Sequence, residues 1–162
     1  MGQNGERWVG AGRRRTHGQG MSFLGSYTYQ LDDKGRVSLP AAFRREVGDQ
    51  PFVLLHAYAE SLALYPQEEW RGVEERLRDL LKHQPSMRLG VLSALSNATE
   101  VMPDAQGRIL IPARLQEAVG LNGQALLVGV MDRIEIWDPA RFEEATRTGA
   151  GDFEKFAPQI FR

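Results

Sequence analysis

The chain has 162 residues, 42% of them hydrophobic and 25% charged, a composition typical of a soluble globular domain large enough to bury a core. It contains no cysteine, which excludes disulfides, thiolate metal sites and a cysteine nucleophile, and no apolar run approaches the roughly eighteen residues of a membrane span. The net charge of −1 hides an asymmetry: residues 1–20 hold four Arg against one Glu, and the rest of the chain therefore carries −4. Any surface for nucleic acid on the body of the protein must be local.

The first twenty residues are rich in Gly and Arg and show no hydrophobic periodicity. This composition predicts a disordered N-terminal extension over residues 1–20. Its run Arg13-Arg14-Arg15 favours a solvated tail over a nonspecific contact with phosphate. Because Met21 opens the first patterned stretch, the upstream segment can also be interpreted as a start-site extension.

The patterned part opens with residues suited to a β-strand, from Phe23 to Leu31. The strand leads into Asp32–Pro40, which reads Asp-x-x-Gly-Arg, an apolar run and Pro, and the same pattern returns seventy-two positions later at Asp104–Pro112. In both copies we expect the glycine to take positive φ in a tight turn, and the aspartate to cap that turn through backbone N–H groups. The predicted turn-forming residues are Asp32, Gly35, Asp104 and Gly107.

A short helix is expected after each motif. Apolar residues recur at helical spacing after Pro40 and Pro112, which we expect at the first helical position, and Gly48 and Gly120 stand where a C-terminal cap belongs. After the first short helix the expected elements are two strands, an amphipathic helix and a second helical run, at residues 51–58, 62–65, 66–85 and 87–95. In the second half, Asp138-Pro139 is a suitable N-cap and first-turn pair for a last helix.

The second half repeats the plan of the first, and the register holds without a gap from Asp32 to Trp70, which indicates an internal duplication. One half is small to bury a core alone. The predicted fold class is therefore α+β: two tandem pseudo-symmetric halves of β-hairpin and short helix, with additional helices, pack across a pseudo-dyad into one double-module domain. The expected divisions are the N-terminal extension, a first module, a helical connection, a second module and a C-terminal tail, at residues 1–20, 21–70, 71–97, 98–145 and 146–162.

The C-terminal tail keeps four large apolar residues, which suggest docking on another surface: Phe153, Phe156, Ile160 and Phe161. Catalysis is poorly supported. The three histidines have no metal-ligand spacing, and the sequence has neither a Gly-x-Ser-x-Gly elbow nor a phosphate-binding loop. We therefore expect no enzymatic activity, no metal, no cofactor and no small-molecule substrate.

Arg36 and Arg108 are the sharper candidates for function, because each follows a turn glycine and is expected to project from the turn. Such a pair suits a grooved polyanion, since Arg can bind a guanine edge with two hydrogen bonds or clamp a phosphate. The alternative is a surface ion pair with the aspartate four residues earlier, which would contribute little to stability. On the residues alone, both interpretations stay open. The predicted DNA-binding residues are Lys34, Arg36, Gln106, Arg108 and, on the first short helix, Arg44.

At these residues the sequence resembles the MraZ family of bacterial transcription regulators. The signatures are Phe23-x-Gly25, then Leu31-Asp32-x-Lys34-Gly35-Arg36-x-x-x-Pro40, and then Asp104-x-Gln106-Gly107-Arg108-Ile109-Leu110-Ile111-Pro112. The resemblance implies two tandem AbrB-type swapped-hairpin modules in a ring-shaped homo-oligomer. It implies a cytoplasmic, nucleoid-associated repressor that binds double-stranded DNA at direct repeats in its own upstream region, before the division and cell-wall gene cluster. The family's loop residues correspond to Lys34, Arg36 and Arg108 of this chain.

The sequence departs from the family pattern at two points in the second half. Ala105 stands where a Lys is common, so the second loop is less cationic. Met102-Pro103 should confine the preceding strand to a sheet edge or shorten it. Two rival interpretations remain. The first is an AbrB-type antitoxin, although an antitoxin would have one module and a disordered toxin-binding tail. The second is a structural ring that does not bind DNA, which the charge of −4 on the body favours.

Overall fold

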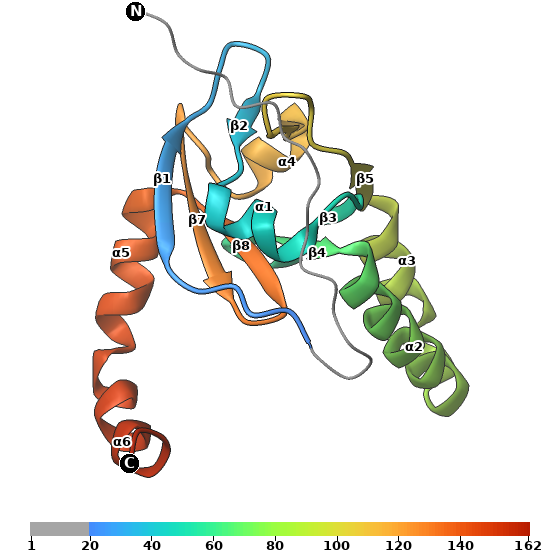
Figure 1. Cartoon of the computed structure of the whole chain (residues 1–162). Helices are drawn as coiled ribbons and strands as arrows, with labels where there is room; N and C mark the ends of the chain where they lie inside the picture. Colours follow the sequence, from blue (N-terminus) through green and yellow to red (C-terminus); the bar gives the residue numbers. More distant parts are fainter. Residues whose placement is uncertain (1–19) are drawn as a thin grey trace, which may run out of the picture.

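The structure is a computed structural model that describes residues 20–162 (Figure 1). The predicted N-terminal extension, including Arg13 to Arg15, lies outside the described residues except for Gly20. In chain order the elements are β1 (Ser26–Gln30), β2 (Arg36–Ser38), α1 (Ala41–Val47), β3 (Phe52–Tyr58), β4 (Ser61–Pro66), α2 (Gln67–His83), the 3₁₀ turn η1 (Pro85–Met87), α3 (Arg88–Ser96), β5 (Thr99–Val101), β6 (Arg108–Leu110), α4 (Ala113–Ala118), β7 (Gln124–Val130), β8 (Arg133–Trp137), α5 (Pro139–Thr148) and α6 (Ala150–Ile160).

The order of elements confirms the predicted duplication. The series β1, β2, α1, β3, β4, α2 of the first half returns as β5, β6, α4, β7, β8, α5 in the second, while η1 and α3 connect the halves and α6 follows them. Helices and antiparallel sheets occur together, so the α+β class is also confirmed.

The two halves exchange their first strands. The six-stranded sheet has the order β1-β7-β8-β4-β3-β5, so β1 of the first half pairs with β7 of the second, and β5 of the second pairs with β3 of the first. A separate two-stranded ribbon joins β2 to β6. Each half therefore completes its hydrogen-bonded ladder only with strands of the other, and the two sequence modules form one sheet system.

A pseudo-two-fold axis relates the halves, and the strand registers locate it. In the sheet, Ala63 faces Glu135, which is its own counterpart seventy-two positions later. In the ribbon, Val37 faces Ile109, which are again counterparts. The axis therefore passes through the β4–β8 pair and the β2–β6 pair, and it places the two Gly-Arg turns symmetrically on one ribbon.

Most of the core lies between the ribbon, the short helices and one face of the large sheet. Val37 and Ile109 are 1% and 0% exposed, so the ribbon is anchored at its centre by two buried β-branched side chains. Burial of such a side chain stabilises a fold by about 1.5–3 kcal/mol. The core draws equally on both halves, with Phe43, Leu54, Leu62 and Leu64 of the first and Leu115, Leu127, Ile134 and Ile136 of the second.

Both short helices begin one residue later than expected. Pro40 and Pro112 occupy the N-cap position with extended ψ values of 140° and 142°, rather than the first helical position. The prediction was wrong because each proline joins its helix through its carbonyl group. The carbonyl oxygen of Pro40 accepts from the N–H of Phe43, and that of Pro112 accepts from the N–H of Leu115, both at 2.9 Å. Asp138 is the side-chain N-cap of α5, as predicted, and accepts from the backbone N–H of Arg141.

The strand before Asp104 is short and lies at an edge, as Met102-Pro103 predicted. β5 has three residues and pairs on one side, with β3. Its counterpart β1 has five residues.

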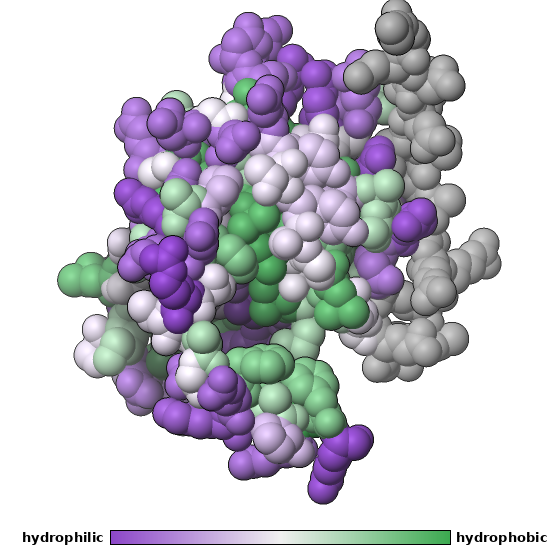
Figure 2. Space-filling model, turned by 90° about the vertical axis from the view of Figure 1, so that its left-hand side faces the viewer, coloured by the Kyte–Doolittle hydropathy of each residue, from purple (hydrophilic) through white to green (hydrophobic). Residues whose placement is uncertain are grey.

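The longer helices leave the sheet on opposite sides (Figure 1). α2 and α3 form a hairpin on one side, and α5 continues into α6 on the other. Hydrophobic side chains gather over the lower end of the face that carries α6 (Figure 2), where the four apolar residues of the predicted tail are 45–71% exposed. Within residues 20–162, no helix has the length and apolar character needed to cross a membrane.

Candidate functional site

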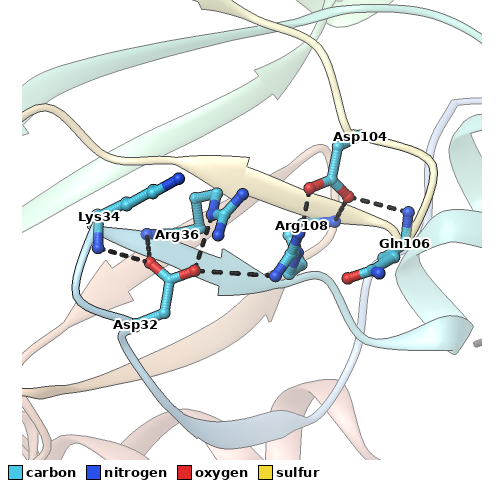
Figure 3. A network of polar contacts seen from close by, with 6 residues as sticks. All are labelled: Asp32, Lys34, Arg36, Asp104, Gln106 and Arg108. Carbon is cyan, nitrogen blue, oxygen red and sulfur yellow. Dashed lines mark hydrogen bonds and ion pairs between the residues drawn. The ribbon is translucent and has the colours of Figure 1, made fainter. Parts of the chain in front are cut away.

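The two Gly-Arg turns lie at opposite ends of the antiparallel β2–β6 ribbon, and the side chains of Arg36 and Arg108 lie between them (Figure 3). In each turn the Asp N–H donates to the Arg carbonyl, and the Gly N–H donates to the Asp carbonyl, at 2.9–3.0 Å. Gly35 and Gly107 have φ values of +83° and +75°. The predicted left-handed glycine turn is therefore present in both halves.

The aspartates cap their turns as the sequence predicts. Oδ1 of Asp32 accepts from the backbone N–H groups of Lys34 and Arg36, at 3.0 and 2.8 Å. Oδ1 of Asp104 accepts in the same way from Gln106 and Arg108, both at 2.9 Å. One carboxylate oxygen is thus occupied in fixing the backbone, and the other remains for a side chain.

Both carboxyl groups have pKa values below the ordinary aspartate value. For Asp32 the main cause is the hydrogen bond from the backbone N–H of Arg36, and the Arg36 side chain adds to it. For Asp104 burial opposes the shift, but the hydrogen bonds from Arg108 and Gln106 together outweigh it and lower the pKa. Both groups are therefore carboxylates at neutral pH, and their protons are unavailable for acid–base chemistry there.

The remaining oxygens hold the arginines. Nε of Arg36 donates to Oδ2 of Asp32 at 2.7 Å, and Nε of Arg108 donates to Oδ2 of Asp104 at 3.0 Å (Figure 3). Nη1 of Arg108 also lies 3.8 Å from Oδ2 of Asp32, across the pseudo-dyad. The surface ion pair considered as the alternative for these arginines is therefore present in both halves.

An ion pair through Nε leaves other N–H donors of an arginine free to bind a ligand. A guanidinium carries five N–H donors in a planar fork, and the pair with Asp uses the edge that includes Nε. The side chains of Arg36 and Arg108 remain 30% and 28% exposed. The carboxylate therefore fixes the direction of each guanidinium while part of its donor edge stays accessible.

The other predicted residues occupy two different places. Lys34 and Gln106 are exposed at equivalent positions of the two turn tips. Arg44 is half-buried, and its side chain lies against Gly107 of the second turn instead of at a tip. Its neighbour Arg45 on α1 is exposed. The structure thus brings four of the five predicted DNA-binding residues to the turns themselves, and puts Arg44 beneath one of them.

Sequence reasoning missed one residue of this site. Gln116 on α4 lies against Gly35 of the first turn, and its Nε2 donates to the carbonyl of Ile111 at 2.7 Å. The signal was available, because Gln116 is the counterpart of Arg44 in the duplication. Among residues 20–162, no group of three His, Asp or Glu side chains is arranged to hold a metal ion.

Two factors favour glycine in the turns: the positive φ, and the lack of space for a Cβ. Gly123 separates the two factors, because it shares the positive φ of Gly35 and Gly107 but has free space around it. All three have positive φ, but a Cβ on Gly35 would lie 2.5 Å from Nε2 of Gln116 and 3.0 Å from the carbonyl oxygen of Ile111, whereas a Cβ on Gly123 would have no described atom within 4 Å. A left-handed alanine costs about 1–2 kcal/mol. We predict that Gly123→Ala loses about this amount and that Gly35→Ala loses more, as measured by urea unfolding. Equal losses of unfolding free energy in the two variants would show that the side chain of Gln116 moves aside without destabilising the protein.

The comparison with known proteins assigns the family. The sequence model described as "MraZ protein, putative antitoxin-like" matches residues 22–91 and 94–159, one match for each half. The chain is 42% identical over 138 residues to the transcriptional regulator MraZ of Desulfitobacterium hafniense (strain Y51), covering 85% of this chain and 96% of that relative. The identity to the transcriptional regulator MraZ of Moorella thermoacetica is 38% over 138 residues, with the same coverage of both chains. On the two matched halves and these relatives, the chain belongs to the MraZ family.

Proposed function

We propose that this protein is a transcription regulator that binds double-stranded DNA through the two Gly-Arg turns of the β2–β6 ribbon. The relatives are named transcriptional regulators, which supports the regulatory role. The observation that carries the DNA contact is the pair of arginines, each directed by a carboxylate and each about 30% exposed, on one ribbon. A two-stranded ribbon fits the major groove, where Arg recognises guanine by its N7 and O6 acceptors.

The local charge supports the same role for these turns. The body carries −4, so a large basic face is not what attracts DNA here. Lys34 adds a cation at the first tip, and Gln106 offers an amide that can donate and accept at a base edge at the second. With few phosphate contacts per chain, one subunit binds weakly at physiological salt.

Several linked subunits would remedy this weakness. The resemblance implies a ring of subunits on direct repeats in the protein's own upstream region, before the division and cell-wall gene cluster, acting as a repressor within the nucleoid. Linked sites raise apparent affinity by about 10²–10⁴ without a new contact.

Two surfaces of the chain support self-association. A groove of about 310 Å³ between α2 and α3 is lined mainly by apolar side chains, including Trp70, Leu77, Leu81 and Val91. On the opposite side of the molecule, α6 exposes Phe153 and Phe156, and Phe161 directly after the helix is also exposed; the three rings contact one another. Because groove and helix lie far apart in one chain, contact between them joins two copies head to tail, an arrangement that gives a ring when the rotation between neighbouring copies closes.

The DNA contact is tested first by Arg36→Ala. The expected result is a loss of affinity for the upstream region of about 10- to 100-fold, since one bidentate contact with guanine contributes about 1–3 kcal/mol. Folding should change by about 1 kcal/mol or less, because the ion pair with Asp32 is partly exposed. Gel shifts and thermal melts measure the two effects. The control is Arg147→Ala on α5, which removes the same charge and the same i,i+4 ion pair far from the turns. Equal affinities for both variants would exclude Arg36 from the interface.

The number of DNA repeats should matter steeply. We expect affinity to rise strongly from one to two to three repeats and to collapse when about five base pairs, half a helical turn, are inserted between repeats. The insertion turns the second repeat to the opposite face of the duplex without changing its sequence. Fluorescence anisotropy on the four probes measures this. A single repeat that binds as tightly as three would show that one subunit suffices.

Head-to-tail assembly makes two damaged variants complementary. Phe156→Glu on α6 and Leu81→Glu in the groove should each give monomers, because every subunit contact then lacks one surface. Their mixture should give dimers, since an intact α6 meets an intact groove once per pair. Light scattering distinguishes these states, and Glu154→Gln, on an exposed position of α6, is the control that should assemble normally. A mixture that stays monomeric, or a Leu81→Glu variant that still forms dimers, would contradict this arrangement.

A further inference from the structure

Each Gly-Arg turn rests on a side chain from the other half of the chain. A Cβ placed on Gly35 of the first half would lie 2.5 Å from Nε2 of Gln116, which belongs to α4 of the second half. A Cβ placed on Gly107 of the second half would lie 2.8 Å from Cδ and 3.0 Å from Cζ of Arg44, which belongs to α1 of the first half. The two supporting residues are counterparts in the duplication.

The first support is fixed by hydrogen bonds. Gln116 donates from Nε2 to the carbonyl oxygen of Ile111 at 2.7 Å, and the N–H of Ile111 donates in turn to the carbonyl oxygen of Gly35 at 2.9 Å. Gly35 of the first half is therefore contacted by two residues of the second half, Gln116 and Ile111, which are themselves joined by a hydrogen bond.

The second support is made by packing. The N–H of Leu39 donates to the carbonyl oxygen of Gly107 at 2.9 Å, which is the counterpart of the bond between Ile111 and Gly35. Nε of Arg44 is buried and has no hydrogen-bond partner among residues 20–162. Cδ and the guanidinium atoms Cζ and Nη1 of Arg44 are the atoms nearest to Gly107, so part of the guanidinium packs against the turn instead of projecting towards a ligand.

We propose that Gln116 and Arg44 are positioning residues, each of which fixes the Gly-Arg turn of the opposite half in the conformation that presents its arginine. The inference deepens the proposed function and rests on it for its DNA arm. Arg44, selected from the sequence as a DNA contact, thereby acts through Arg108 and not on DNA directly. Gln116 acts in the same way on Arg36.

The duplication supplies the decisive variant, because Arg44 can be replaced by the residue that its own counterpart carries. In Arg44→Gln the new amide can donate to the carbonyl of Leu39, as Gln116 does to Ile111. Arg44→Ala leaves the space beneath Gly107 empty. Both substitutions remove the same charge, so they differ in support and not in electrostatics.

The first measurement uses the free protein. In ¹⁵N–¹H spectra, Arg44→Ala should shift the amide resonance of Gly107 more than that of Gly35, and Gln116→Ala should shift Gly35 more than Gly107. Arg45→Ala, the exposed neighbour of Arg44 on α1, is the matched control and should shift neither strongly. This arm decides the support without DNA. Shifts confined to the turn of the mutated half would overturn the proposal.

The second measurement is DNA affinity against salt. Arg44→Ala should lose at least about tenfold in affinity and Arg44→Gln should retain most of it, with an unchanged salt slope. A direct phosphate contact predicts the reverse: equal losses in both variants and a slope smaller by about 0.9. That outcome would overturn the positioning role of Arg44. If the wild-type protein does not bind its upstream DNA at all, the proposed function fails, while the resonance shifts still decide whether the turns are supported across the halves. Thermal melts identify any variant that does not fold. If Arg44→Ala does not fold, Arg44→Met, which keeps an unbranched stem without the charge, takes the place of Arg44→Gln and should retain most of the affinity, and a loss of about tenfold in a folded Arg44→Met would overturn the positioning role.

Discussion

The pairing of β2 with β6 about the pseudo-dyad is the constraint on which the rest of the molecule depends. Val37 and Ile109 face each other at its centre and are almost wholly buried, so the ribbon cannot shift by one residue without turning both side chains to solvent. That register sets the positions of both Gly-Arg turns at once. It also orients the exchanged strands β1 and β5, which lead into those turns and close the ladders of the opposite half.

The carboxylates convert this backbone frame into a chemical surface. Each aspartate uses one oxygen for two backbone N–H groups and the other for the Nε of an arginine, so a single side chain defines both the turn and the direction of the guanidinium. Ion pair and ligand recognition are therefore not rival explanations of Arg36 and Arg108. The ion pair reduces the conformational freedom that an arginine would otherwise lose on binding, which is the general advantage of a preorganised contact.

The sequence predicted the duplication, the glycine turns, the aspartate caps and the order of the elements, because each has a local signature at a fixed offset. It predicted that the halves pack across a pseudo-dyad, but not which strands pair between them. The spacing of apolar residues in β1 is the same whichever half supplies its partner, and the pairing of β1 with β7 depends on contacts a hundred residues apart. The same limit applies to the site. Arg44 reads as an exposed basic residue on a short helix, and only the packing of α1 beneath Gly107 shows that it is a support. The predicted first residues of α1 and α4 were wrong by one position, because proline suits both the N-cap and the first helical position.

The pair Ala63 and Glu135 on the pseudo-dyad separates a fused chain from a symmetric dimer of single modules. On a true two-fold axis a residue faces a copy of itself, and two glutamates at that position would repel each other across the strands. Here one side is an alanine, and Glu135 is instead engaged by Arg133, Trp137 and Ser61. Because the two halves belong to one chain, the two residues that face each other on the axis, Ala63 and Glu135, need not be identical. Two copies of the second half would place two glutamates opposite each other at this position, which disfavours their pairing by up to about 1 kcal/mol relative to the pairing in the fused chain.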